Sequence, residues 1–278
     1  MSAASRERFA DVVRAGGAAG DPDDVRLDLA LLLISAEALP DDVLAGDGLD
    51  LLLRHGLTEL DALASAVPDE GRDDLRLRTV LGRFAGESTD YSRLEANLLT
   101  EVLRDRRGLP ILLSTVWTEV ARRTGIPAYG VGLPGHFVVG VGDPDGARVL
   151  VDPWSGGRLL PYDRARELVA GTGRSLKPEH LRPHDPIDTI DRVLGNVRVW
   201  ASTPERARHR LWAAELALLL PRHDLGLRRD YGEALIAVGR YPEASLVLEE
   251  YADTVAGPMP LEAEHARRIA RQARARLN

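Results

Sequence analysis

Apolar residues recur at helical spacing along almost the whole chain, and only the segment at about 128–151 departs from this pattern. There the apolar residues form short valine-rich runs bounded by Gly and Pro, at 128–132, 137–141 and 149–151, which are typical of strands. An Asp-Pro-Asp-Gly turn signal at 143–146 predicts that the last two runs form an antiparallel hairpin. The sequence therefore predicts an α+β protein that is mostly helical and has one small antiparallel sheet.

The helix directly before the strands carries a long apolar stripe. Pro110 suits the first turn of a helix, where its missing N–H group costs nothing, and Gly125 follows the last periodic residue. The sequence predicts a buried helix from Pro110 to about Thr124. Because aromatic residues make up only 5% of the chain, we expect a core built mainly from Leu, Val and Ala.

The same pattern divides the chain into three parts. A polar loop near residue 88 separates the first helices from the central helix and strands, and two prolines within 183–186 interrupt the helical pattern again. The predicted parts are an N-terminal helical subdomain at 1–88, a core at 89–185 and a helical tail at 186–278.

Small and aromatic residues in the tail fit one repeat of the tetratricopeptide type between Leu225 and Pro258. The residues that fit are Gly232, Gly239, Tyr241 and Ala244. Fewer than three repeats present only a shallow concave surface. Two interpretations stay open, a peptide-binding groove and a tail that only covers the flank of the core.

Composition limits the possible functions. The net charge of −7 disfavours a general nucleic-acid-binding role, because phosphate contacts need a concentrated positive surface. The chain contains no cysteine, which excludes disulfides, thiolate metal sites and cysteine nucleophiles. The seven histidines are scattered; only His180 and His184 have helical spacing, and Pro183 lies between them, so we expect solvated loop histidines and neither a metal nor a cofactor.

The chain also lacks the signals of a membrane or exported protein. Its opening residues have no apolar core of the kind found in signal peptides. The apolar run Leu29–Ile34 is far too short to span a bilayer. We therefore expect a cytoplasmic protein with no membrane contact.

A histidine and an aspartate flank the predicted hairpin. If the turn is centred on Pro144, His136 and Asp152 lie opposite each other, about 4.5–5.5 Å apart at Cβ. At that separation a carboxylate can orient an imidazole and stabilise its protonated form. The alternative is a loop histidine and an aspartate that merely starts a turn.

Four stretches together resemble the SirB-type transglutaminase-like family, whose members are often labelled regulators of sirC expression. They are GLPILLS at 108–114, GIPA at 125–128, PGHF at 134–137 and VDPWSGG at 151–157. The resemblance implies a transglutaminase/cysteine-protease-like core, in which a helix packs on a small antiparallel sheet, flanked by helical segments. Asn97 also resembles an asparagine of the family's lead-in helix; alternatively it is a solvated helix residue.

In the wider superfamily a cysteine opens the core helix, where the helix N-terminus lowers the thiol pKa, and a His and an Asp follow on adjacent strands. In this chain the cysteine position falls on or near Pro110, which has no reactive atom, while His136 and Asp152 match the other two members. Ser114 lies one turn further along the helix, roughly 5–6 Å away, and is a speculative nucleophile. The alternative is a buried serine that bonds back to the carbonyl of Pro110. Thr115 and Ser155 are further hydroxyl candidates.

These residues predict a transglutaminase-like protein without its nucleophile that acts as a binding or regulatory protein for a protein or peptide partner. Trp154 and Trp117 are expected to line the relict cleft, and the alternative for both is plain core packing. The alternative function is that of a hydrolase or transferase that uses His136 and Asp152 with Ser114 or water as the nucleophile.

Overall fold

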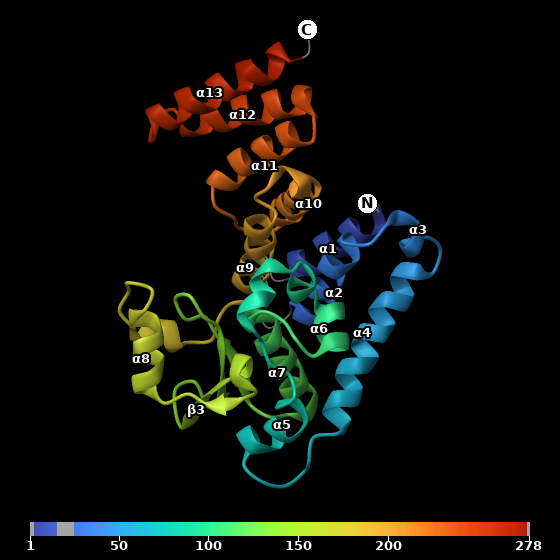
Figure 1. The fold of residues 1–278 in the computed structure, drawn as a ribbon, viewed down its shortest axis with the longest axis vertical. Coiled ribbons are helices and arrows are strands. Elements are labelled where there is room, and N and C mark those ends of the chain that lie inside the picture. Colours follow the sequence, from blue (N-terminus) through green and yellow to red (C-terminus); the bar gives the residue numbers. More distant parts are fainter. Residues whose placement is uncertain (1–2, 16–24, 277–278) are drawn as a thin grey trace. The chain divides into compact units, whose positions relative to one another are not determined.

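The computed structural model describes residues 3–15 and 25–276 of the 278-residue chain. Its residues group into two compact units, Met1–Val193 and Leu194–Asn278, whose elements are coloured along the sequence in Figure 1. Helix α9 (Pro186–Trp200) contributes residues to both units. Each unit is described separately below.

The first unit consists of helices and 3₁₀ turns around one sheet. The helices that precede the sheet are α1 (Ala3–Ala15), α2 (Leu27–Glu37), α3 (Asp41–Leu44), α4 (Gly48–Ser65), α5 (Asp73–Leu81), η2 (Ser88–Ser92), η3 (Glu95–Asn97), α6 (Leu99–Asp105) and α7 (Pro110–Thr124); η4 (Pro153–Ser155), α8 (Tyr162–Ala170) and η5 (Pro178–Leu181) lie within or after it. The strands are β1 (Ala128–Val131), β2 (Val138–Gly142), β3 (Arg148–Asp152) and β4 (Arg158–Leu159), in the order β1-β2-β3-β4 and all antiparallel. The prediction of a mostly helical α+β fold with a small antiparallel sheet is confirmed.

Helix α7 runs through the centre of this unit, and its predicted bounds are confirmed. Pro110 occupies its first turn, and Gly125 ends it in the left-handed region with φ of 70°, as expected for a glycine at that position. Val116, Trp117 and Val120 are fully buried. Such an all-round burial is typical of a helix that is packed on several sides. The sheet and α4 both contact it.

The predicted hairpin between β2 and β3 forms, but its register differs from the prediction. Val139 pairs with Val151, so Asp152 falls opposite Val138 and not opposite His136. The turn is centred on Asp145 and not on Pro144, because the N–H of Asp143 donates to the carbonyl of Ala147. A shift of two residues leaves the alternation of side chains between the two faces unchanged.

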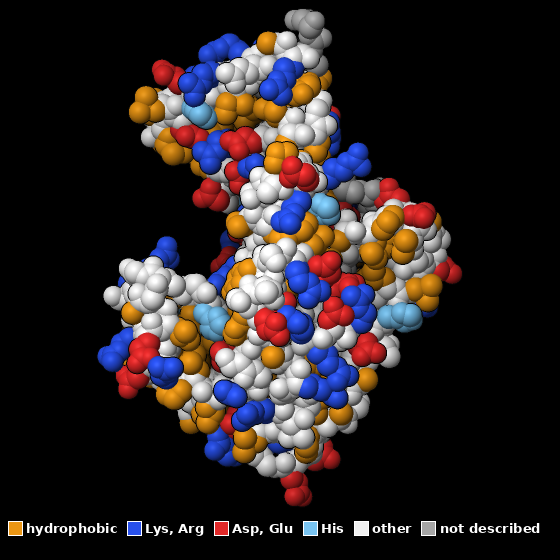
Figure 2. Space-filling view, viewed as in Figure 1, with side chains coloured by type: hydrophobic (Ala, Val, Ile, Leu, Met, Phe, Trp, Pro, Cys, Tyr) orange, Lys and Arg blue, Asp and Glu red, His pale blue; other side chains and the backbone are white. Residues whose placement is uncertain are grey.

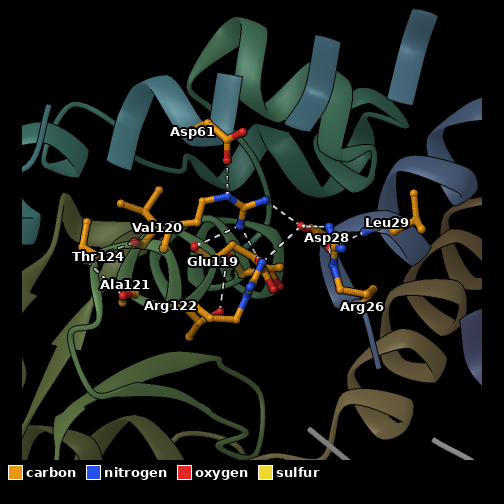
Figure 3. Close-up of polar contacts among 12 residues, drawn as sticks. Arg26, Asp28, Leu29, Asp61, Glu119, Val120, Ala121, Arg122 and Thr124 are labelled. Carbon is orange, nitrogen blue, oxygen red and sulfur yellow. Dashed lines mark hydrogen bonds and ion pairs between the residues drawn. The ribbon is translucent and has the colours of Figure 1, made fainter. Parts of the chain in front are cut away.

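An ion-pair network joins the end of α7 to two helices from far earlier in the chain (Figure 3). The guanidinium groups of Arg26, Arg122 and Arg123 face the carboxylates of Asp28, Asp61 and Glu119. The fully buried Asp28 accepts from Arg123 at 2.6 Å, and Arg123 also reaches Asp61 at 2.8 Å and Glu119 at 2.6 Å. The network therefore fixes α2 and α4 against α7.

The second unit is helical throughout its described part. It contains the end of α9, η6 (Pro204–Arg206), α10 (Ala207–Ala217), α11 (Gly226–Ala237), α12 (Tyr241–Val255) and α13 (Pro260–Ala275). Successive helices contact each other along the chain. A Cβ atom at Gly232 would lie 2.6 Å from Leu248 Cγ, so this glycine permits close packing of α11 on α12.

The surface of the first unit mixes charges of both signs. On the face shown in Figure 2, Lys and Arg side chains are interspersed with Asp and Glu, and no single-sign stripe runs across it. Within the described residues, 3–15 and 25–276, no helix is both long enough and apolar enough to cross a membrane.

Candidate functional site

A tight turn holds His136 in place. The N–H of His136 donates to the carbonyl of Leu133 at 3.1 Å, with Pro134 and Gly135 between them. Gly135 has φ of +76°, so the turn has the sequence and the backbone of a type II turn, which favours Pro and then Gly at its centre. The Leu-Pro-Gly-His stretch thereby presents the imidazole directly before β2.

Asp152 ends β3 and caps the short η4 turn. Its Oδ1 accepts from the backbone N–H of Trp154 at 3.0 Å, and its Oδ2 accepts from the Ser155 hydroxyl at 2.8 Å. Gly156 and Gly157 follow with φ of +68° and +70°, values that residues with a side chain rarely adopt. In the Asp-Pro-Trp-Ser-Gly-Gly stretch, the Trp154 N–H and the Ser155 hydroxyl thus hold the Asp152 carboxylate in place.

The two side chains meet. Nε2 of His136 lies 3.0 Å from Oδ1 of Asp152, with 14% and 10% of the respective side chains exposed. A neutral imidazole that donates from Nε2 keeps Nδ1 as an acceptor. Nδ1 of His136 has no hydrogen-bond partner within the part of the chain that the structure describes. The pair can therefore accept a proton or a hydrogen bond at Nδ1 while Asp152 orients the ring.

The candidate nucleophiles are directed elsewhere. Pro110 is buried at the start of α7, and its ring carries no reactive atom. The hydroxyl of Ser114 is fully buried and donates to the carbonyl of Phe137 at 3.3 Å, so the alternative bond to Pro110 is not formed. Thr115 donates to the carbonyl of Ile111 at 2.9 Å. None of the three makes a hydrogen bond to His136 among the described residues.

The two tryptophans lie in different surroundings. Trp154 is half-buried and packs against Tyr91, with ring centroids 5.7 Å apart. Its ring also covers Gly86, where a Cβ atom would lie 1.9 Å away. Trp117 is fully buried beneath Gly157, so it supports the site from the core and does not line a cleft. Tyr91 was not predicted, because a lone tyrosine in a polar loop gives no pattern.

Asn97 lies in the η3 turn and is 1% exposed, so its interpretation as a solvated helix residue is wrong. Its side-chain N–H₂ donates to the carbonyl of Arg93 at 3.2 Å. Its Oδ1 has no partner in the described structure, and no described hydrogen bond joins it to His136 or Asp152.

Arg192, on α9, is the second residue that sequence analysis missed. Its Nη2 donates to the carbonyl of His136 at 2.9 Å and to that of Leu133 at 3.3 Å. The guanidinium carbon also lies 5.3 Å from the centroid of the Phe137 ring. Arg192 therefore holds both ends of the His136 turn. Burial lowers its pKa, and the proximity of Tyr91 acts in the opposite direction.

The polar groups around the site offer little to a metal ion. A cavity of about 400 Å³ is lined by Asp152 and Ser155 together with Arg164 and Glu167 of α8. No group of three or more His, Asp or Glu side chains suited to a metal occurs in the described ranges. His184, expected to be a solvated loop residue, is instead half-buried, with its ring centroid 5.1 Å from that of Phe137 in an edge-to-face arrangement, and burial lowers its pKa.

Known proteins share the region that contains these residues. Residues 54–195 match the model of the Transglutaminase-like superfamily. A UPF0162 protein of Xylella fastidiosa (strain Temecula1) is 34% identical over 176 residues, 60% of this chain and 62% of that protein. One of Pseudomonas aeruginosa is 34% identical over 156 residues, 52% and 56% of the two chains. The chain thus matches less than two thirds of the length of these relatives. Because the family model covers more than half of it, the chain belongs to the Transglutaminase-like superfamily.

Proposed function

We propose that this chain is a transglutaminase-like protein that has no acyl-transfer activity and binds a protein or peptide partner at its His136–Asp152 site. Acyl transfer by a transglutaminase-like triad needs a nucleophile that the histidine can activate. The sequence has no cysteine, and the helix position that would carry one holds Pro110.

The position of the Ser114 hydroxyl is the observation that carries the proposal. Ser114 lies one helical turn from position 110, where the nucleophile is expected. Its side chain is fully buried, and its hydroxyl donates to the Phe137 carbonyl. A serine nucleophile needs its hydroxyl within about 2.6–3.2 Å of the base. The Ser155 hydroxyl is likewise engaged, by Asp152. The His–Asp pair is then left with a binding role.

A hydrolase that uses water is the second candidate. The free Nδ1 of His136 favours it, because an imidazole oriented by a carboxylate can accept a proton from a bound water. In this candidate, His136 acts as the general base and Asp152 orients it, with no covalent intermediate.

Further parts of the assignment are also proposals. We propose that the chain is of the SirB type, that it acts in the cytoplasm, and that 1–88, 89–185 and 186–278 are its functional parts. The close approach of α11 and α12 at Gly232, and the left-handed Gly239 with φ of +83°, support a tetratricopeptide-like tail. Such a tail offers a second surface for a regulatory partner.

An activity screen tests the proposal against the hydrolase. The full chain and its His136→Ala and His55→Ala variants are compared on ester, amide and thioester substrates; His55 is an exposed histidine on α4 and serves as the matched control. We expect equal background rates from all three proteins. A rate that falls at least tenfold in His136→Ala alone would instead establish the hydrolase.

A further inference from the structure

Arg192 is a partly buried cation that no carboxylate neutralises. Within the described residues its hydrogen-bond acceptors are two backbone carbonyls, those of Leu133 and His136, and its remaining contact is the face of the Phe137 ring. The two hydrogen bonds use Nη2, and the ring contact uses the guanidinium carbon. Nε and Nη1 of Arg192 have no partner among these residues and are not sealed from solvent.

Other arginines of the same unit are arranged differently. Arg123, also largely buried, contacts the carboxylates of Asp28, Asp61 and Glu119. Arg107 contacts those of Glu87 and Asp90. Removing a charge from water is costly unless a counter-charge or hydrogen bonds compensate it. At Arg192 the compensation from the protein is incomplete.

This cation lies at the turn that carries the His136 imidazole. Arg192 bonds to the carbonyl of His136 itself, so its guanidinium lies at the base of the turn that carries the ring. Tyr91 is close enough to both Arg192 and Asp152 for each to affect its pKa: burial raises that pKa, Arg192 lowers it and Asp152 raises it. The guanidinium thus lies at the turn that carries the imidazole, and Tyr91 packs on Trp154, whose N–H donates to Asp152.

We propose that Arg192 binds an anionic group, a carboxylate or a phosphate, on the ligand of the His136–Asp152 site. This inference rests on the binding role proposed above and names the chemistry of the ligand. The guanidinium fork matches both anions in geometry. The rings of Tyr91 and Trp154, which pack against each other beside Asp152, cover the adjoining apolar part.

Small anions test the assignment on the wild-type chain. Inorganic phosphate and acetate are titrated separately at constant pH and ionic strength, and the imidazole signals are followed by NMR, with the His136 signal identified through His136→Gln. We expect saturable shifts of the His136 signal with at least one anion, and the two titrations distinguish phosphate from carboxylate. No shift with either anion, up to about 100 mM, would overturn the proposal while leaving the absence of acyl transfer intact.

Variants assign the effect to Arg192. Arg192→Gln should weaken anion binding about tenfold or more, and Arg192→Lys less, because a lysine keeps the charge but loses the planar fork. Arg54→Gln removes an equal charge from the exposed face of α4 and should bind as the wild type does. Circular dichroism verifies that each variant is folded. Equal affinity of Arg192→Gln and Arg54→Gln would contradict the assignment.

Discussion

Two polar clusters contact the central helix α7, and they differ in how completely their charges are paired. Near its C-terminal end, Asp28, Glu119 and Asp61 face three arginines. Closer to its start, Ser114 donates to the carbonyl of Phe137, which follows His136; the His136–Asp152 pair and Arg192 form the second cluster. In the first cluster each charged group meets an opposite charge. The second keeps a free imidazole nitrogen and a cation without a carboxylate.

This difference separates a structural role from a functional one. A closed network contributes only when all of its members are present, because the loss of one leaves another buried and unpaired. An open cluster retains capacity for a ligand, at a cost in stability. The Asp28 network should therefore be far more sensitive to substitution than the His136–Asp152 site.

The largest expected effect follows from breaking the closed network. Asp28→Asn leaves three arginines with one carboxylate fewer, and we expect the free energy of unfolding to fall by about 3–5 kcal/mol. Urea denaturation followed by circular dichroism measures it. Asp11→Asn is the control, since its partner Arg14 and Asp11 itself are both exposed and such a pair contributes less than about 1 kcal/mol. Similar losses for the two variants would contradict the distinction.

The same network predicts an acid-sensitive stability. Burial alone would raise the pKa of Asp28, but hydrogen bonds from Arg26 and Arg123 outweigh it, so the pKa lies below the ordinary value of 3.8. A carboxyl with a lowered folded-state pKa stabilises the fold above its unfolded pKa and loses that contribution as the pH falls through the folded value. We expect the wild type to lose stability below about pH 4 more steeply than Asp28→Asn. Parallel curves of unfolding midpoint against pH would show that Asp28 is not the group responsible.

A comparison of two arginines gives an intermediate effect. Arg123→Met should cost about 2–3 kcal/mol, because Asp28 loses its most buried partner and keeps only the two half-exposed arginines Arg26 and Arg122. Arg192→Met leaves only two carbonyls short of a donor and keeps an apolar stem against Phe137, so we expect a loss of about 1 kcal/mol. Thermal unfolding of the two variants measures the difference. A loss at Arg192 equal to that at Arg123 would mean that the cation is retained for stability.

Local sequence signals predicted more of the fold than of the site. Pro110 and Gly125 fixed the bounds of α7, because proline and glycine each favour one end of a helix. The meeting of His136 with Asp152 was expected, although the hairpin register was two residues off, because the centre of the turn is set by backbone bonds that the Asp-Pro-Asp-Gly signal does not specify. Arg192 was not predictable: it lies 56 residues from its acceptor His136, and no periodicity distinguishes it from a solvated helix arginine.

The smallest effect on stability, and the sharpest on the site, is expected from Asp152→Asn. An amide keeps only one acceptor oxygen: when this oxygen faces Trp154 the N–H₂ can donate to the Ser155 hydroxyl, and when it faces Ser155 the bond from Trp154 is lost. We expect the free energy of unfolding to change by less than about 1 kcal/mol. If the amide N–H₂ turns towards His136, it donates to Nε2, and the proton of the neutral imidazole moves to Nδ1. Nitrogen-15 NMR of the His136 ring distinguishes the two tautomers. An Nδ1 that carries the proton can no longer accept one from water or a ligand. In that tautomer the variant remains folded, but His136 has lost its free acceptor. An unchanged tautomer would show that the amide presents its oxygen, and not its N–H₂, to Nε2 of His136.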